Sequence, residues 1–424
     1  MEKLATLGSD KSVTTINAIM AELLTDIKPS QITILRESSP YKDIRDSLRK
    51  ALSYMGINAE VNDIVIGEGV KTWKDKISEY DFDVLDITPG RKYMALTAAN
   101  YSKAKEVRYV YLKNEGEGYR IFGYVPFNEI KIFNMRSGDE VKFTALPPIT
   151  VVSEKYSELD IESLTALYNI LSLHREVKVK LGNDYMEERE DEFTELCKTR
   201  SGMKAFKEEE KIREIIKKDD VYFVADTNVY IHLGNRIKRL FYDKDKGFRL
   251  LPTTSVYKEL KYKLTSTQKD PNLVKFRLGY LTFKDAHLSA ISGLENRIKD
   301  ASYGDVEFKK EVQRLKGAIA NTVYIVTRDQ ALGISVSPEI KTIVLKTKVD
   351  RQKFDMGEFL HCMSFYSVYS SFKESIRRDL FLELDGRNIV KITSVEEENK
   401  VNVETLEPKY NYAKVLEILR DAIS

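Results

Sequence analysis

The chain has 424 residues, of which 42% are hydrophobic and 32% charged, and this length and composition are typical of a globular protein of about three domains without a membrane helix. The 68 basic and 66 acidic residues give a net charge of +2, which excludes a general basic attraction for nucleic acid, so any RNA contact must be local. No signal peptide is evident, so we expect a cytoplasmic protein. Cys197 and Cys362 are too distant in sequence to support a disulfide framework or a zinc site.

Residues 1–150 alternate between strand and helix patterns. The expected strands read KLATLG, QITILR, DFDVLDIT and VRYVYLK, and the expected helices cover 14–25, 42–55 and 92–98. Strands that alternate with helices indicate βαβ units and a mainly parallel sheet. We therefore predict an N-terminal α/β domain with a Rossmann-like sheet.

Three further segments follow the LPPIT stretch that ends this domain. Residues 151–219 are rich in charge and carry apolar positions spaced as one helix face, which predicts a helical connector. Residues 220–350 return to strands separated by long helices, which predicts a second α/β domain. Residues 351–424 predict an α+β extension with a long helix near 356–378, a hairpin that turns at Asp385 and Gly386, and a terminal helix.

Acidic residues follow two of the expected strands in the second α/β domain. The strand VYFVA ends directly in Asp226, and VYIVT is followed closely by Asp329. Acids at the carboxyl ends of parallel strands converge in the crevice above the sheet. Glu259 joins them in the first turn of a helix. Oxygen ligands without His or Cys suit Mg²⁺ or Mn²⁺ rather than zinc, so the pattern predicts a hard-cation site whose chemistry is phosphodiester hydrolysis.

A fourth acid is expected on the helix that leads into VYIVT. Glu311 has a suitable spacing from Asp329, and Asp305 is the alternative. The pattern of strand-DTN, helix-borne Glu, helix-start acid and strand-TRD resembles the PIN-domain nucleases over residues 220–350. The resemblance implies a three-layer α/β/α domain that cleaves single-stranded RNA to leave a 5′-phosphate. It also implies that four acids bind one or two divalent ions and act in catalysis. These acids are Asp226, Glu259, Glu311 and Asp329.

Other polar residues near these acids each have two interpretations. Asn228 and Thr327 can orient water or metal ligands, or can simply make turn and cap hydrogen bonds. Arg236, Lys238 and Arg239 can hold RNA phosphates, and a solvated helix face explains them equally well.

The histidines and one aromatic stripe are expected to be structural. The four histidines have no metal-ligand spacing, and His232 is the one nearest the acids in sequence. The stripe follows helical spacing, which favours packing over base stacking. It consists of Phe365, Tyr366, Tyr369 and Phe372.

Two loops of the N-terminal domain are candidate anion sites. ATLGSDKS and DITPGRKYMAL each place glycine and hydroxyl side chains between a strand and a helix. Backbone amides at the start of a helix attract phosphate groups. The chain has neither a GxGxxG after its first strand nor a Walker-type loop, which disfavours a dinucleotide or P-loop site. Two such turns on one sheet edge predict a single pocket for a polyanion.

These loops resemble the CARF domain, the sensor of cyclic oligoadenylate second messengers in type III CRISPR defence, over residues 1–150. The resemblance implies a cyclic oligoadenylate ligand, with cyclic tetra-adenylate as the first expectation, and a homodimer that binds one symmetric ligand on its two-fold axis. Arg91 and Lys92 can neutralise phosphates, and Ser9 and Thr88 offer hydroxyl groups. The implied contact residues are Thr6, Gly8, Ser9, Asp10, Thr88, Gly90, Arg91 and Lys92.

The favoured interpretation is an allosteric antiviral effector in which ligand binding to the N-terminal domain switches on RNA cleavage by the PIN-like domain. One alternative is a ring nuclease that degrades its own ligand with help from Ser9 or Lys92. Another is a ligand-responsive regulator that binds DNA through the connector, although residues 158–218 show no basic recognition helix. A third is a toxin-like PIN ribonuclease controlled by an antitoxin, which the large N-terminal domain disfavours.

Overall fold

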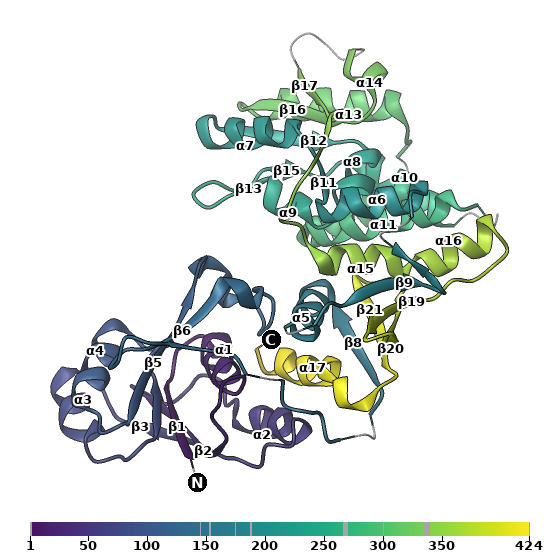
Figure 1. The fold of residues 1–424 in the computed structure, drawn as a ribbon. Coiled ribbons are helices and arrows are strands. Elements are labelled where there is room, and N and C mark those ends of the chain that lie inside the picture. The colour runs from purple at the N-terminus through teal and green to yellow at the C-terminus, as the bar shows by residue number, and fades with distance from the viewer. Residues whose placement is uncertain are drawn as a thin grey trace. The chain divides into compact units, whose positions relative to one another are not determined.

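The computed structural model describes residues 2–144, 146–151, 154–173, 175–186, 189–265, 270–299, 301–334 and 340–423 (Figure 1). The chain folds into two compact units. Unit 1 contains Met1–Lys178, Phe381–Lys391 and Asn402–Ser424, and unit 2 contains Val179–Leu380 and Ile392–Val401. Within the described ranges, every helix is too short or too polar to span a lipid bilayer.

Unit 1 is built on a seven-stranded sheet with the order β3-β2-β1-β4-β5-β6-β7. The strands from β3 to β5 in this order are parallel, and β6 and β7 are added antiparallel. This confirms the α/β class and the mainly parallel sheet. The strands are β1 (Glu2–Leu7), β2 (Pro29–Arg36), β3 (Glu60–Val65), β4 (Val84–Asp86), β5 (Glu106–Leu112), β6 (Ile130–Asn134) and β7 (Glu140–Val141). The helices are α1 (Ser12–Glu22), α2 (Arg45–Tyr54), α3 (Val70–Ile77) and α4 (Lys92–Tyr101), with short 3₁₀ turns η1 (Glu115–Tyr119) and η2 (Phe127–Glu129).

The order of the strands places a switch point beside β1. The chain builds β2 and β3 on one side of β1, and then crosses to build β4 and β5 on the other side. Loops that leave β1 and β4 therefore diverge at the same sheet edge, where α/β proteins bind ligands. The strands are held there by buried apolar residues, among them Leu7, Leu35 and Leu85, which are fully buried in one core cluster.

Most of the C-terminal end of the chain belongs to unit 1, and residues 392–401 belong to unit 2. Helix α17 (Tyr412–Ile423) packs against α2, α5 (Ile161–Leu171) and β8 (Tyr156–Asp160). The predicted hairpin is present as β19 (Leu380–Leu384) and β20 (Arg387–Ser394), followed by β21 (Lys400–Thr405) and η5 (Pro408–Tyr410). Its turn residues Asp385 and Gly386 have φ angles of 50° and 77°, the backbone that an Asp-Gly turn favours.

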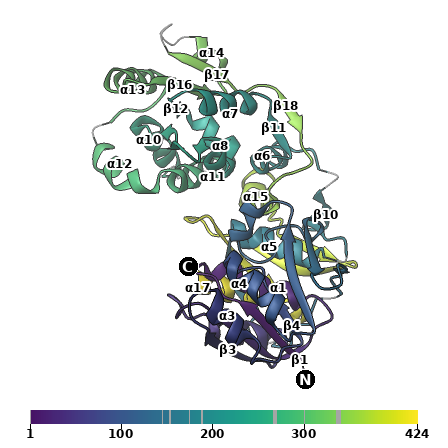
Figure 2. The same ribbon diagram turned by 90° about the vertical axis from the view of Figure 1, so that its left-hand side faces the viewer.

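Unit 2 contains a four-stranded, fully parallel sheet with the order β15-β12-β16-β17. Figure 2 shows α8, α10 and α11 side by side, as in Figure 1, and these helices contact one another. The sheet strands are β12 (Val221–Ala225), β15 (Leu250–Leu251), β16 (Thr322–Thr327) and β17 (Lys341–Val344). The helices between and after them are α8 (Thr227–Leu233), α9 (Arg236–Leu240), α10 (Thr254–Leu264), α11 (Asn272–Ala286), α12 (Ile291–Arg297), α13 (Asp305–Ala318) and α14 (Gln330–Ile334), with η4 (Leu288–Ala290) and the small hairpin β13 (Tyr242–Asp243) and β14 (Gly247–Phe248).

The segment predicted as a helical connector also contains strands. Its helices are α5, α6 (Glu192–Ser201) and α7 (Glu208–Lys218), and its strands are β8, β9 (Lys178–Leu181), β10 (Asp184–Tyr185) and β11 (Lys204–Phe206). Strand β11 pairs with β18 (Lys348–Asp350). The charged helix faces dominated the sequence pattern, whereas these strands are only two to five residues long and too short to leave a clear alternation.

The two cysteines form a disulfide, which corrects the expectation from the sequence. Cys197 in α6 is bonded to Cys362 in α15 (Met356–Ser364), with Cα atoms 5.5 Å apart and a separation of 165 positions in sequence. Near it, the buried ion pair of Arg200 and Glu358 joins the same two helices at 2.9 Å. The spacing of the two cysteines in sequence gave no sign of the disulfide, because the packing of α6 on α15 brings them together.

The long helix predicted near 356–378 is two helices, α15 and α16 (Tyr366–Lys373). Packing of the aromatic stripe is confirmed for Phe365, Tyr366 and Tyr369, which are at most 2% exposed. The rings of Tyr366 and Tyr369 lie 5.8 and 4.6 Å from that of Phe193. Of the histidines, His287 and His361 are buried, and His174 lies outside the described residues.

Candidate functional site

Asp226 stands where the buried strand β12 gives way to α8. Its Oδ1 accepts a hydrogen bond from the backbone N–H of Val229 at 2.9 Å, so it caps the helix. Its other oxygen accepts a hydrogen bond from the hydroxyl of Thr327. Burial raises the pKa of the Asp226 carboxyl to about 6, hydrogen bonds from Thr327 and Val229 oppose this rise, and the charge of Glu259 adds to it. Asp226 is therefore both a cap and a buried carboxylate that resists ionisation.

Asp329 follows the neighbouring strand β16, and Thr327 links it to Asp226. The Thr327 hydroxyl, which donates to Asp226, accepts from the backbone N–H of Asp329 at 2.8 Å. The Asp329 Oδ1 in turn accepts from the N–H of Ala331 at 2.7 Å. The parallel pairing of β12 with β16 places both strand ends at one edge of the sheet. Thr327 thus supports the two acids, one of the roles considered for it from the sequence.

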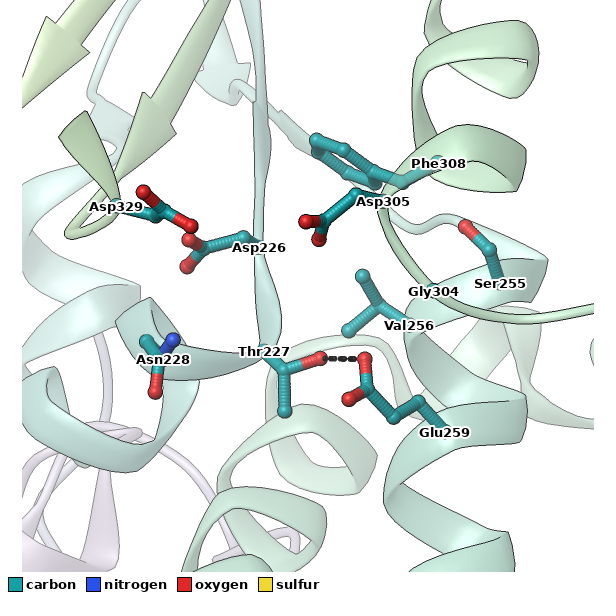
Figure 3. Close-up of a pocket in the computed structure, with 10 residues that line it drawn as sticks. All are labelled: Asp226, Thr227, Asn228, Ser255, Val256, Glu259, Gly304, Asp305, Phe308 and Asp329. Atoms are coloured by element: carbon teal, nitrogen blue, oxygen red, sulfur yellow. Dashed lines mark hydrogen bonds between the residues drawn. The ribbon is translucent and has the colours of Figure 1, made fainter. Parts of the chain in front are cut away.

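Glu259 lies across the pocket on α10. Its Oε2 accepts a hydrogen bond from the Thr227 hydroxyl at 2.7 Å, which fixes the carboxylate toward the start of α8 (Figure 3). Asn228 lines the same pocket. Its backbone carbonyl accepts a hydrogen bond from His232 Nδ1 at 2.8 Å.

Of the two candidates for the fourth acid, Asp305 lines the pocket. It begins α13 directly after Gly304, whose φ of 98° suits glycine and turns the chain into the helix. Glu311 lies further along α13 and binds the start of α10 instead. It accepts hydrogen bonds from the N–H groups of Thr254 at 2.6 Å and Ser255 at 2.9 Å, and from the Ser255 hydroxyl at 2.7 Å.

The pocket therefore brings together four carboxylates from four elements. Figure 3 shows Asp226, Asp305 and Asp329 directed into it, with Glu259 across from them. Oxygen donors of this kind match the preference of Mg²⁺ and Mn²⁺. Among the described residues, however, no three His, Cys, Asp or Glu side chains are grouped closely enough to form a complete metal site. The donor chemistry fits a hard cation, and binding one would require side-chain adjustments.

Comparison with models of protein families and with curated proteins found no match to this chain. The functional interpretation therefore depends on the residues and their geometry.

The basic residues expected to contact RNA are engaged with acids. Arg236 is mostly buried and pairs with Glu209 at 2.8 Å. Lys238 pairs with Asp285 at 2.6 Å, and Arg239 with Asp355 at 2.8 Å; their side chains are about half exposed. Arg236 is therefore a structural residue here. Lys238 and Arg239 can reach solvent, but each already has a carboxylate partner.

Arg328, between Thr327 and Asp329, is a basic residue that the sequence analysis did not single out. His232 donates through Nδ1 to Asn228, so its Nε2 accepts a hydrogen bond from the Arg328 guanidinium. Burial, followed by the charge of Arg328, lowers the pKa of His232 to about 3, which keeps the imidazole neutral. The guanidinium also lies 5.5 Å from the centre of the Phe206 ring. Its position directly before Asp329 in the TRD sequence was the available signal.

Unit 1 contains a second pocket at the switch point of its sheet. The loops after β1, β2 and β4 line it, as the two candidate anion loops predict. Gly8, Ser9, Asp10 and Arg91 are the predicted contact residues among the lining. Arg91 lies 3.2 Å from Glu37 and 3.6 Å from Asp10. The remaining lining residues are Arg36, Glu37, Ser38, Ser39, Pro40, Tyr41, Pro89 and Met94.

Arg36 is a lining residue that was missed because it ends the apolar strand QITILR. Its side chain is 5% exposed and its Nε lies 2.5 Å from Asp63. A Cβ on Gly8 would come within 2.7 Å of the Arg36 Cγ, so glycine is needed for this close approach. Gly8 thus makes room for a cation at the pocket wall.

Four of the predicted contact residues lie outside the pocket lining: Thr6, Thr88, Gly90 and Lys92. Thr6 and Thr88 donate through their hydroxyls to the carboxylate of Asp86 at 3.3 and 2.9 Å. Burial raises the pKa of this Asp86 carboxyl to about 6. Gly90 packs on the side chain of Leu7, and Lys92 is exposed at the start of α4. The two threonines therefore support the strand ends beneath the loops.

Proposed function

We propose that unit 2 is a divalent-metal-dependent endoribonuclease that cuts single-stranded RNA, and that a cyclic oligoadenylate bound to unit 1 activates it in type III CRISPR antiviral defence. The observation that carries the nuclease proposal is the pocket lined by Asp226, Glu259, Asp305 and Asp329. Ionised acids that share one pocket repel one another, and a bound cation would offset this repulsion. The RNA substrate and the 5′-phosphate product come from the PIN resemblance.

The residues of this pocket have distinct roles in the proposal. The four carboxylates would hold Mg²⁺ or Mn²⁺, with Asp305 in the place first considered for Glu311. When bound, the cation would supply an activated water and neutralise charge on the phosphate oxygens. Thr327 holds Asp226 in position relative to Asp329, and Thr227 holds Glu259. The charge of Arg328 acts on Asp226, but its guanidinium is bound to His232 and lies over Phe206, outside the pocket lining.

The activator proposal depends on the pocket in unit 1. Arg36 and Arg91 bring two cations to its lining, as a ligand that carries several phosphates requires. Both are paired with carboxylates, Arg36 with Asp63 and Arg91 with Glu37, so the phosphates would have to compete with these acids. The CARF resemblance supports cyclic tetra-adenylate as this ligand and a homodimer as the state that binds it. The ligand must bind the active arrangement more tightly than the inactive one, because equal affinity for both shifts no population.

One cleavage assay tests both parts. Fluorescently labelled single-stranded RNA is incubated with the full chain and Mg²⁺ or Mn²⁺, with and without cyclic tetra-adenylate or cyclic hexa-adenylate. We expect cleavage that requires the metal and increases with one of the two rings. Asp226→Ala should abolish cleavage and leave ligand binding to unit 1 intact, whereas Asp245→Ala, an exposed acid of the same unit, should cut normally.

Two results would reject the proposal. Cleavage retained by Asp226→Ala would remove the acidic pocket from the reaction. Cleavage that is the same with and without either ring, together with no ring binding, would remove the regulatory assignment and leave the nuclease assignment in place. Analysis of the ring after incubation for linear products also tests the ring-nuclease alternative.

A further inference from the structure

A pair of exposed tyrosines lies next to the acidic pocket. Tyr262 is on α10, three residues after Glu259, and residues three apart on a helix are neighbours on its surface. Tyr303 directly precedes Gly304 and Asp305, which line the pocket. The centroids of the two rings are 5.2 Å apart with 33° between the ring planes. Each tyrosine therefore lies within three residues of a carboxylate that lines the pocket.

The pair is open to solvent although its neighbours are packed. Tyr262 is 57% exposed and Tyr303 is 38% exposed, whereas Tyr257 on the same helix is fully buried in the core. Large aromatic rings left in water forgo the free energy of burial. An exposed ring pair beside a polar pocket is thus available to a ligand with a flat, apolar face.

The segment that carries Tyr303 is attached to α10. The Lys258 side chain donates a hydrogen bond to the carbonyl of Ala301, two residues before Tyr303. On the other side of Tyr303, Gly304 has a φ of 98° and redirects the chain into α13. These two features hold the Tyr303 ring next to the Tyr262 ring and Asp305 next to the pocket.

We propose that Tyr262 and Tyr303 form a stacking site for one unpaired base of the RNA strand whose phosphate enters the acidic pocket. The inference rests on the proposed nuclease function and names how the substrate is recognised. Every base has a π-face, so stacking on tyrosine tolerates any sequence. It also anchors the strand without charge, which matters because four carboxylates repel a polyanion.

The stacking site selects single strands for a physical reason. A base inside a duplex is stacked on its neighbours on both faces, and it must be unpaired and unstacked before it can lie on a tyrosine ring. An unpaired base is free of this requirement. The pair therefore accounts for a preference for single-stranded RNA that the acidic pocket alone does not provide.

Binding is measured separately from cleavage, so that the two proposals can fail independently. The full chain with Asp226→Asn is titrated, without added metal, with single-stranded RNAs that carry 2-aminopurine at successive positions, because stacking on tyrosine quenches this base. We expect quenching at one position. Tyr262→Ala or Tyr303→Ala should weaken binding by about five- to 160-fold, the range for loss of one base–aromatic contact.

Two control variants separate stacking from other effects. Tyr262→Phe keeps the ring and should bind within about twofold of the parent, because stacking does not need the hydroxyl. Tyr242→Ala removes a tyrosine of the same exposure, 57%, elsewhere in unit 2, and should bind as the parent does. Circular dichroism of each variant checks that the helices are retained.

An RNA that lacks the base at the quenched position completes a double-mutant cycle. The effect of Tyr262→Ala should disappear with this RNA and persist when another base is removed. The stacking site is rejected if no RNA binds, or if the tyrosine variants bind RNA as tightly as the parent does. It is also rejected if the variants lose the same affinity with every abasic RNA, or if Tyr262→Phe binds as weakly as Tyr262→Ala. Tyrosine-dependent quenching without any cleavage by the unsubstituted chain would instead reject the nuclease and leave the stacking site standing.

Discussion

Asp226→Asn should stabilise unit 2 at neutral pH although it removes a proposed catalytic group. Burial raises the pKa of this carboxyl from 3.8 to about 6, and at about 1.4 kcal/mol per tenfold change in proton affinity this corresponds to about 3 kcal/mol. Because the folded-state pKa is above the unfolded value, the folded protein holds the proton where the unfolded chain has lost it. The free energy of unfolding therefore falls as pH rises from about 3.8 to about 6 and stays lower above that.

Asparagine cannot ionise, so the variant should lack this pH dependence. Its side-chain oxygen can still accept from the N–H of Val229, and the Thr327 hydroxyl can rotate to accept from the new amide group. Allowing about 1 kcal/mol for poorer hydrogen bonding, we expect the variant to be about 2 kcal/mol more stable than the unsubstituted chain at pH 7. The difference should shrink toward pH 4.5.

Hydrogen exchange of peptides from β12 measures this effect locally, which avoids treating two compact units as one transition. The measurement is made between pH 4.5 and 7.5 without metal, and repeated with Mg²⁺. Added Mg²⁺ should protect β12 in the unsubstituted chain and leave the variant unchanged, since binding stabilises only the state that binds. Equal protection of both proteins at pH 7 without metal would refute the argument from the buried charge.

Three further outcomes follow from the two pockets. Asp305→Asn should reduce RNA cleavage by more than about 10–100-fold, which is the effect of losing a residue that only supports a metal ligand. Glu311→Gln should retain cleavage and lower the free energy of unfolding by about 1–3 kcal/mol, because its hydrogen bonds to α10 become weaker. The opposite pattern in cleavage rates and melting temperatures would return Glu311 to the pocket. Thr327→Val removes a hydrogen bond that lowers the pKa of Asp226, so the acidic limb of the pH–rate profile should move to higher pH, and an unmoved limb would contradict this role. Arg91→Ala should weaken cyclic tetra-adenylate binding about tenfold in a calorimetric titration, and unchanged affinity would take Arg91 out of the ligand site.

The sequence was sufficient to place the acids that follow strands. Asp226 and Asp329 each come after an apolar strand, and parallel pairing brings such ends together, as β12 and β16 do. It was not sufficient for the acid on α13. Asp305 and Glu311 are six residues apart, and at about 100° per residue they lie on different faces of a helix. Which face meets the sheet depends on packing, which no local pattern records.

The ligand residues of unit 1 show the same limit. Thr6 and Thr88 sit at the strand ends as expected, but their hydroxyls are used by a buried acid, Asp86. That acid lies in the expected strand DFDVLDIT, and it was not identified as buried because aspartate is seldom fully buried. Arg36 was overlooked for the converse reason, since it continues an apolar strand and becomes part of the pocket only through its closeness to Gly8. Such contacts between distant segments decide function, and no spacing of residues along the sequence indicates them.

The route of the backbone has a practical consequence for dissecting the two activities. The polypeptide leaves one compact unit and enters the other at four points along its length: after Lys178, Leu380, Lys391 and Val401. No single cut can therefore release either half as an uninterrupted fragment, and a truncation at residue 150 or 219 would also strip away the partner strands and the terminal helix supplied from the far end. Point substitutions in the intact polypeptide are the appropriate tools for separating sensing from cutting.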